Sequence, residues 1–257
     1  VLAVADTVSV LRGGRLIDGP LPAGNIDAES LASLIIGPSA RALGREDRTA
    51  LTGAASPPPG HQARPADPTA PPVVQLKAVS TRPDGDGPPL QAVDLAVQPG
   101  EIVGIAGVEG NGQRTLVRAI CALAGISSGS VELAGRDVTA APLAARRAAG
   151  LRAIPFERNV EGLSLTSPLW ENWSAGGLLR KPLLASISPG GMRRDCKAAL
   201  DAWDVRYADV GQRAGSLSGG NAQKVILARE MDEAAKLNIA AQPTRGLDIG
   251  ATAFVWE

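Results

Sequence analysis

Residues 217–230 combine a serine and two glycines with the start of a helical pattern. The segment reads Leu-Ser-Gly-Gly-Asn-Ala-Gln-Lys-Val-Ile-Leu-Ala-Arg-Glu. Backbone N–H groups at a helix N-terminus point toward a bound anion, and the helix dipole favours negative charge there. Gly219 and Gly220 let a phosphate approach because they carry no Cβ, and Ser218 adds a hydroxyl. The segment therefore predicts an anion site, and the alternative is a loop and helix cap that bind nothing.

A second glycine-rich segment lies between the apolar run 101–106 and a helical pattern over residues 113–123. That order of strand, loop and helix is typical of a phosphate loop, G-x-x-x-x-G-K-[ST], whose lysine reaches the phosphates and whose hydroxyl holds magnesium. Here Gln113 stands at the lysine position and Arg114 at the hydroxyl position. Loss of a charged donor costs about 1.5–3 kcal/mol of phosphate affinity.

We therefore expect a weakened phosphate cradle, and the alternative is a glycine-rich turn without a ligand. The candidate nucleotide-binding residues are Gly107, Glu109, Gly110, Asn111, Gly112, Gln113, Arg114 and Thr115.

A third segment follows the strand-like run 237–241 and reads Gln-Pro-Thr-Arg-Gly-Leu-Asp over residues 242–248. Taken in order, the glycine-rich loop, the LSGGN segment and AAQPTRGLD resemble ABC-type ATPases. More narrowly, they resemble the second nucleotide-binding domain of tandem ATP-binding subunits in sugar and nucleoside importers. The resemblance covers residues 73–257, and residues 1–43 resemble the end of a first ABC domain.

The resemblance implies a damaged catalytic centre. In ordinary ABC ATPases an Asp at the end of the Walker B strand holds magnesium and the following Glu activates water, but Ala241 and Gln242 occupy those positions here. Gln cannot accept a proton, and removal of a general base lowers rates by about a hundred- to ten-thousand-fold. We therefore expect no intact catalytic residue and no metal ligand in this chain. Asp248 corresponds to the D-loop.

The Q-loop region falls at residues 154–158, Ile-Pro-Phe-Glu-Arg, where relatives carry V/I-P-E-D-R. Phe156 departs from that pattern. Glu157 either contacts nucleotide and transporter or is an exposed loop acid. Residues 162–212 are expected to form the helical insert that contacts the membrane subunit. Within the insert, Trp170 and Trp173 are three residues apart, which favours packing on one helix face over ligand binding.

In ABC proteins each nucleotide lies between the phosphate loop of one domain and the signature of the other. The resemblance assigns the signature to Leu217, Ser218, Gly219, Gly220, Asn221 and Gln223. We expect this signature to grip the γ-phosphate of ATP bound to the partner domain, where Mg²⁺ is also held. The chain's own site is expected to bind nucleotide weakly and not to turn over.

The expected fold is α/β: a P-loop NTPase-type ABC domain with a mostly parallel sheet core, an antiparallel β edge and a helical insert. Residues 1–43 are assigned to the end of a first ABC domain, 44–72 to a Pro/Ala-rich linker and 73–257 to the second ABC domain. In the first segment we predict strands 7–11 and 15–17 and a helix 28–36. Both ends fall inside a pattern, so we expect a piece of a longer protein.

Composition narrows the possible partners. The 257 residues include 26 Lys plus Arg and 26 Asp plus Glu, so no positive field favours nucleic acid. Cys121 and Cys196 lack metal-ligand spacing, so we expect buried thiols and neither a metal site nor a disulfide. No run of 18 apolar residues occurs, which with the resemblance implies a peripheral protein on the cytoplasmic face of the membrane.

The resulting hypothesis is an ATP-binding subunit of an ABC importer for simple sugars or nucleosides, which hydrolyses ATP as part of the complete protein. The implied partners are a first ABC domain in the same chain, transmembrane permease subunits and, indirectly, a substrate-binding lipoprotein. A nucleotide-sensing or scaffolding domain without hydrolysis is the main alternative, and a soluble ABC ATPase of translation or repair is another. The residues leave nucleoside and pentose equally open as substrates.

We predict that this chain alone shows no Mg²⁺-dependent ATP hydrolysis, because the general base, the metal ligand and the phosphate-binding lysine are absent together. A phosphate-release assay on the purified chain checks this. Turnover that exceeds a denatured control and disappears with a chelator contradicts the prediction.

Overall fold

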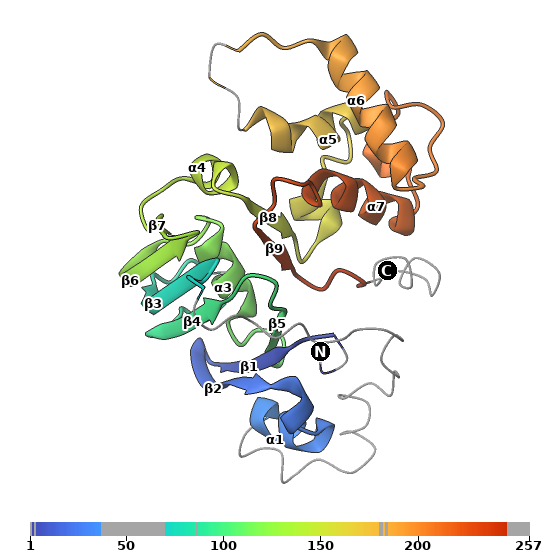
Figure 1. Ribbon diagram of the computed structural model, residues 1–257. Helices are drawn as coiled ribbons and strands as arrows, with labels where there is room; N and C mark the ends of the chain where they lie inside the picture. Colours follow the sequence, from blue (N-terminus) through green and yellow to red (C-terminus); the bar gives the residue numbers. More distant parts are fainter. Residues whose placement is uncertain are drawn as a thin grey trace. The chain divides into compact units, whose positions relative to one another are not determined.

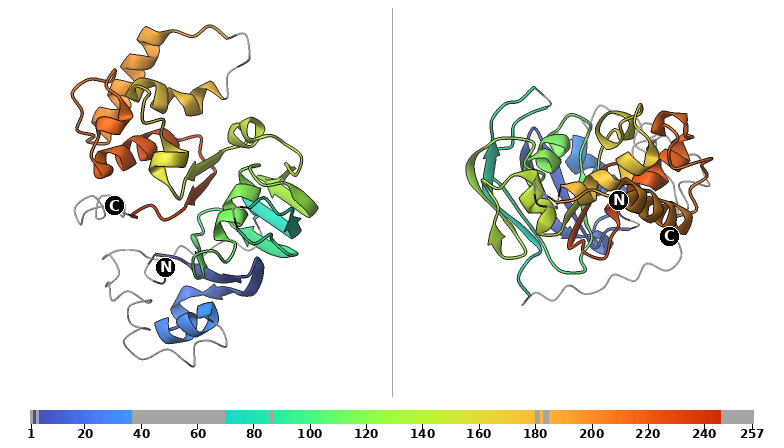
Figure 2. Two further views of the ribbon diagram at one scale, coloured as in Figure 1. Left: turned by 180° about the vertical axis from the view of Figure 1, so that it is seen from behind. Right: turned by 90° about the horizontal axis from the view of Figure 1, so that it is seen from above.

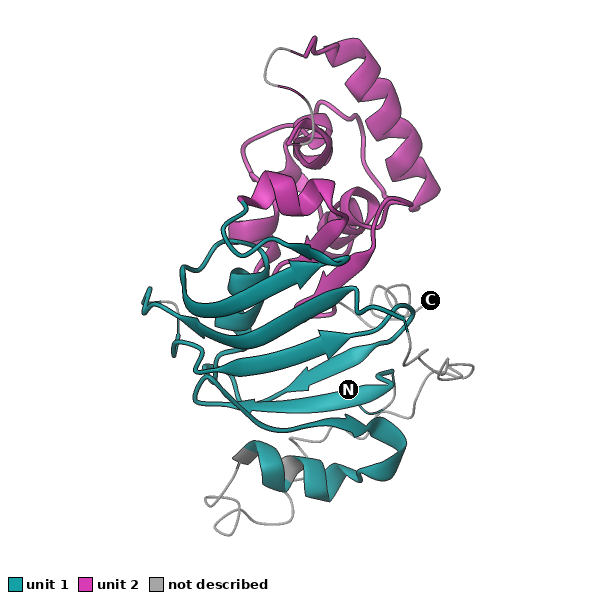
Figure 3. Cartoon of the chain, turned by 60° about the vertical axis from the view of Figure 1, so that its left-hand side comes forward, with its two compact units in different colours: residues 1–141 teal, residues 142–257 magenta. Residues whose placement is uncertain are grey.

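The computed structural model describes residues 2, 4–36, 70–85, 87–179, 182 and 185–245. Most of the expected linker 44–72, together with Asp248 and the rest of residues 246–257, lies outside the described residues. The chain divides into two compact units, Val1–Ala141 and Pro142–Glu257 (Figure 3). Each unit has its own hydrophobic core and is described separately.

A mixed three-stranded sheet in the first unit contains the strand that precedes the glycine-rich loop. β1 (Thr7–Arg12) and β2 (Arg15–Pro22) form an antiparallel hairpin, and β1 also pairs in parallel with β5 (Val103–Ala106), in the order β2-β1-β5 (Figure 1). The central strand is buried on both faces, as expected for a strand with neighbours on both sides.

The hairpin also carries the short helical elements of the N-terminal segment. A 3₁₀ turn η1 (Ala23–Asn25) leads to α1 (Ala28–Ile36), which lies beside the hairpin in Figure 1 and in the left-hand view of Figure 2. The core between them consists of Ala5, Val8, Val10, Ala23, Leu31 and Ala106. The strands and helix predicted for residues 7–36 are confirmed, and they share a sheet with β5. Their assignment to a first ABC domain stays a prediction.

An antiparallel sheet forms the rest of the first unit, with strand order β4-β3-β6-β7. Its strands are β3 (Val74–Thr81), β4 (Val93–Val97), β6 (Ile126–Leu133) and β7 (Arg136–Asp137), and α3 (Gln113–Ile120) follows the glycine-rich loop. This sheet is the antiparallel edge that the sequence predicts. The predicted helix 113–123 ends early, because Ala122 adopts a φ of 58° outside the helical region.

The second unit is mostly helical. α4 (Leu143–Ala148) precedes β8 (Leu151–Ile154), a π-helical turn η3 (Arg158–Gly162), α5 (Leu169–Leu178) and α6 (Pro189–Ala202). A 3₁₀ turn η4 (Ala214–Ser216) then leads to α7 (Gly219–Glu230) and β9 (Leu237–Ala240), which pairs in parallel with β8. The insert expected over residues 162–212 thus contains α5 and α6. Of the mostly parallel core that we expected, the described strands show two parallel pairs, β1–β5 and β8–β9.

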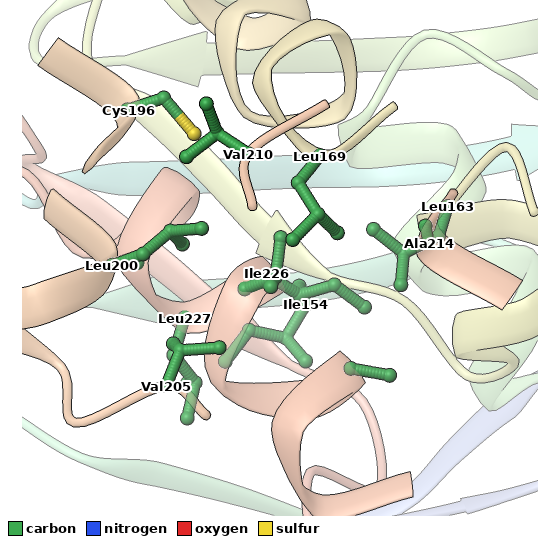
Figure 4. Packing of buried hydrophobic residues seen from close by; sticks show 13 residues of the cluster. Ile154, Leu163, Leu169, Cys196, Leu200, Val205, Val210, Ala214, Ile226 and Leu227 are labelled. Carbon is green, nitrogen blue, oxygen red and sulfur yellow. The ribbon is translucent and has the colours of Figure 1, made fainter. Parts of the chain in front are cut away.

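Helix α7 lies at the centre of the core of the second unit. Ile226 and Leu227 pack among side chains from α5, α6 and the intervening loops (Figure 4). Trp170 and Trp173 pack against this cluster, and the Trp173 indole Nε1 donates to the Ala228 carbonyl at 3.3 Å. The Arg193 guanidinium lies 5.2 Å from the centre of the Trp170 ring. The prediction that the tryptophans pack on a helix face is confirmed.

Both cysteines are buried thiols, as expected. Cys196 is fully buried in the core of the second unit, and this burial raises the pKa of its thiol to about 12. With that pKa, only about one thiol in ten thousand is ionised at pH 8, against roughly one in four for an unperturbed cysteine.

We therefore predict that Cys196 resists alkylation by iodoacetamide at pH 8 in the folded protein and reacts at least about a hundredfold faster in urea, because the thiolate is the reactive species. Peptide mass spectrometry of both samples measures this. Equal labelling of Cys196 with and without urea would show that the site is open.

Candidate functional site

The glycine-rich loop, residues 107–112, connects β5 to α3 in a conformation that depends on glycine. Gly110 has a φ of 86° and Gly112 a φ of 109°, which side chains with a Cβ rarely adopt. A Cβ on Gly107 would meet the Leu11 carbonyl at 2.6 Å and would also collide with the Gln113 amide. The loop therefore lies tightly between the hairpin strand β1 and the start of α3.

The turn of the hairpin holds the loop through Asn111. The Gly13 N–H donates to Asn111 Oδ1 at 3.1 Å, and the Gly14 N–H donates to the Asn111 carbonyl at 3.0 Å. Asn111 Nδ2 in turn donates to the Val108 carbonyl within the loop, at 3.1 Å. Sequence reasoning placed Asn111 among the nucleotide-binding residues. In the structure its side chain fastens the loop to the hairpin.

Two other predicted site residues also bond within the chain. Gln113 Nε2 donates to the Val108 carbonyl at 3.2 Å, so the residue at the lysine position folds back over the loop. The Thr115 hydroxyl donates to the Pro88 carbonyl at 3.0 Å, and Thr115 is 1% exposed. The hydroxyl of this predicted nucleotide-binding residue therefore bonds to the 87–90 segment.

The signature segment begins with one exposed residue, Ser218, among half-buried neighbours. Ser218 is the N-cap of α7 and is exposed, and Gly219 and Gly220 form the first helical turn. Ser218 Oγ accepts from Asn221 Nδ2 at 3.0 Å and from the Asn221 N–H at 3.4 Å. The N-cap that the sequence allowed and the exposed helix N-terminus needed for an anion are thus both present.

The remaining signature residues have packing roles. Asn221 Oδ1 accepts from the Arg206 N–H at 2.7 Å, which ties the preceding loop to α7. Lys224 Nζ donates to Asp204 in the same loop, and this hydrogen bond lowers the pKa of the Asp204 carboxyl. Gln223 is 4% exposed, so it belongs to the buried face of α7 and not to the open N-terminus. Leu217 packs against the core.

The Walker B positions carry no carboxylate at the end of β9. Ala241 is buried and its N–H donates to the Ile154 carbonyl at 3.0 Å, so it extends the pairing with β8. Gln242 is exposed with a φ of 48°, and its Oε1 accepts from Arg245 at 3.3 Å. Within the described ranges, no three His, Cys, Asp or Glu residues come together to hold a metal ion.

The Q-loop segment connects β8 to the π-helical turn. Phe156 is half-buried and Glu157 is exposed. The Glu157 carbonyl accepts from Val160, Glu161 and Gly162 N–H groups at 3.1, 2.8 and 3.3 Å, which closes the turn. Contact of Glu157 with a nucleotide or a transporter stays a prediction.

Sequence reasoning missed a buried ionic cluster formed by Arg147, Arg152, Arg229, Glu230 and Asp232. Arg152 is 1% exposed and pairs with Asp232 at 2.9 Å, and Glu230 is 2% exposed. The signal for it in the sequence is the charged pair Arg229–Glu230, which follows the apolar residues 225–228 at the end of the helical pattern.

A glycine-rich loop between a strand and a helix, a helix that begins at the exposed Ser218 and a strand that ends at the Walker B positions are the features of an ATP-binding domain of the ABC class. In agreement, residues 90–245 match the family described as ABC transporter. The chain belongs to this family. Among solved structures, the ATP-binding cassette MJ0796, a dimer bound to ADP and Pi, aligns with a TM-score of 0.58 and 21% identity. The alignment covers 71% of this chain and 79% of that one, and it shows the same fold.

Curated relatives are more similar in sequence. The guanosine import ATP-binding protein NupO of Bacillus subtilis is 34% identical over 98% of this chain and 46% of its own length. The nucleoside import ATP-binding protein NupA of Lactococcus lactis is 32% identical over 99% of this chain and 47% of its own. The glucose import ATP-binding protein TsgD13 of Haloferax volcanii is 34% identical over 100% of this chain and 44% of its own length. The chain thus spans about half the length of these relatives.

The two glycines of the hairpin turn provide a matched test of how the loop is held. Both have left-handed backbone, with φ of 57° at Gly13 and 75° at Gly14. A Cβ on Gly13 meets nothing within 4 Å, whereas one on Gly14 collides with the Pro89 carbonyl.

We predict that Gly13→Ala costs about 1 kcal/mol of unfolding free energy through backbone strain alone. Gly14→Ala should cost at least about 2 kcal/mol more, because the hairpin must leave the 88–91 segment and the loop. Urea unfolding followed by far-UV circular dichroism measures both variants. Equal losses would show that the turn does not pack closely against Pro89.

Proposed function

We propose that this chain is part of the ATP-binding subunit of an importer for nucleosides or simple sugars. In this proposal its signature completes an ATP site whose phosphate loop lies on another ABC domain. Family membership supports the ATP-binding role, and relatives whose names describe guanosine, nucleoside, glucose and ribose import support the transport role. This similarity favours import over a sensing or scaffolding domain and over a soluble ATPase of translation or repair.

The observation that carries the proposal is the contrast between the two helix N-termini. At α7, Ser218 is exposed and two half-buried glycines follow it. The glycine N–H groups and the Ser218 hydroxyl are donors for an incoming phosphate, and Ser218 Oγ caps the Asn221 N–H. Before α3, the side chains of Asn111 and Gln113 bond to the loop and to the hairpin. The signature is therefore the better phosphate site of the two.

The chain's own site is proposed to be degenerate for a chemical reason. Gln113 lacks the charge of a lysine, and neither Ala241 nor Gln242 offers a carboxylate for magnesium or for a proton. Mg²⁺ and hydrolysis then belong to the site on the partner domain. This division of labour fits a second, degenerate domain in a tandem protein, with residues 1–43 as the end of the first domain.

The proposed partners follow from the same assignment. The insert with α5 and α6 meets transmembrane permease subunits on the cytoplasmic face of the membrane, and a substrate-binding lipoprotein acts through the permease. No helix in the described part of the chain is long and apolar enough to cross a membrane. The peripheral location is part of the proposal.

Two substitutions in the complete protein test which site works. Gly219→Asp places a carboxylate at the open end of α7, where it repels the γ-phosphate and fills the space that the glycine leaves. Like charges repel far more strongly in a desolvated sandwich than in water, so we expect more than about a hundredfold loss of ATP hydrolysis. Gln113→Ala changes a site that does not hydrolyse, so we expect activity within about threefold of the wild type.

Steady-state hydrolysis is measured for both variants with the permease present. Equal losses, or a larger loss for Gln113→Ala, would mean that the glycine-rich loop of this chain is the working site. That result would reverse the assigned roles.

A further inference from the structure

A buried ion triad lies at the C-terminal end of α7. We call Arg147, Arg229 and Glu230 the Glu230 triad. Glu230 Oε2 lies 2.9 Å from Arg147 Nη1, and Glu230 Oε1 lies 2.7 Å from Arg229 Nε. The side chains are 9%, 12% and 3% exposed for Arg147, Arg229 and Glu230. Two guanidinium groups thus share one buried carboxylate.

The triad joins α7 to four other elements of the second unit. Arg229 Nη1 donates to the Gly162 carbonyl in η3 at 2.9 Å and to the Asn172 carbonyl in α5 at 3.2 Å. Arg147 belongs to α4, and Glu230 Oε2 also accepts from the Ala153 N–H of β8 at 3.4 Å. One side chain, Arg229, therefore connects α7 to both the π-helical turn and α5.

Glycines let these elements approach one another closely. A Cβ on Gly176 of α5 would lie 2.8 Å from Arg147 Nη2 and 3.4 Å from Arg229 Cγ. A Cβ on Gly162 would lie 2.7 Å from Ile226 Cδ1. A methyl group at either position would therefore displace the end of the Arg147 or Ile226 side chain.

Stability alone does not account for such a triad. Buried ion pairs are often replaced by apolar residues of similar size with no loss of stability, because the desolvation of the charges offsets their attraction. What apolar residues lack is the set of directed hydrogen bonds from Arg229 to two backbone carbonyls. The triad therefore specifies an arrangement of elements more than it stabilises the fold.

We propose that the Glu230 triad is a positioning device. Glu230 orients Arg229, and Arg229 holds α5 and η3 against the C-terminal end of α7, whose N-terminus carries the signature. A helix of 12 residues spans about 18 Å, so α5 and the signature are linked by one rigid element. The consequence for transport rests on the proposed function, in which the insert meets the permease.

Amide hydrogen exchange on the full chain tests the positioning role without the permease. In the triple variant Arg147→Met/Arg229→Met/Glu230→Leu the cavity stays filled, but the bonds to Gly162 and Asn172 are lost. We expect peptides from α5 and η3 to exchange at least about tenfold faster and peptides from α6 to stay unchanged. Unchanged protection of α5, or equal loosening of every peptide, overturns the proposal.

Two further variants keep the test decisive. Arg229→Lys keeps the charge beside Glu230 and preserves folding, but an ammonium has no planar fork to reach the carboxylate and both carbonyls together. We expect the same local loosening of α5. Lys197→Met is the matched control, since it breaks the exposed Lys197–Asp201 pair of α6, 64% and 52% exposed, and leaves α5 unchanged.

The complete importer in proteoliposomes tests the consequence for transport. For Arg229→Lys we expect ATP hydrolysis within about threefold of the wild type and at least about tenfold less substrate moved per ATP. An unchanged ratio overturns the role in transport. A wild-type importer that neither hydrolyses ATP nor transports refutes the proposed function instead, and hydrogen exchange still decides whether the triad positions α5.

Discussion

Close packing of neighbouring groups against glycines is the constraint on which the glycine-rich loop and the packing around α7 depend. In the first unit the hairpin turn lies against the glycine-rich loop. This contact needs glycine at position 112, because a Cβ there would lie 3.0 Å from Gly14 Cα. In the second unit α5 and η3 pack against α7 where Gly176 lies beside Arg229 and Gly162 lies beside Ile226. Protein interiors do not stretch to admit an extra methyl group without strain. The glycines therefore determine where the polar groups of each site lie.

Side-chain chemistry and hydrogen bonding both weaken the glycine-rich loop as a phosphate site. Gln113 has lost the charge of the usual lysine, and its amide also bonds to the Val108 carbonyl. Asn111 bonds to the hairpin turn, so a phosphate entering the loop must displace contacts within the protein. Such displacement costs affinity, because each lost hydrogen bond must be replaced by one to the ligand. At the signature, Ser218 is exposed and its Oγ accepts from Asn221, so the hydroxyl can still donate its proton to a phosphate.

Buried charge has a different role from apolar packing in the second unit. The core around α7 is apolar and fills space, whereas Glu230 and its two arginines make directed bonds that apolar side chains cannot replace. In the proposed positioning role, these directed bonds select one arrangement of helices among several of similar packing energy. Such selection fits the proposed function, in which α7 presents the signature to a partner domain.

The sequence by itself determined the features that depend on residue type and local order. Strands 7–11 and 237–241, the helix after Ser218 and the missing carboxylates at Ala241 and Gln242 follow from local pattern and from the chemistry of each side chain. Periodicity and capping act between residues a few positions apart, so a sequence shows them directly.

The tertiary structure alone decided which distant groups meet. Parallel pairing of β1 with β5, the bond from Thr115 to Pro88, the bond from Arg206 to Asn221 and the Glu230 triad each join residues remote in sequence. The sequence shows that a hydroxyl, an amide or a carboxylate is present, but it does not show which hydrogen-bond partner that group takes. The partner is chosen by the packing of whole elements, because a buried polar group must find its hydrogen bond in the place where the fold puts it.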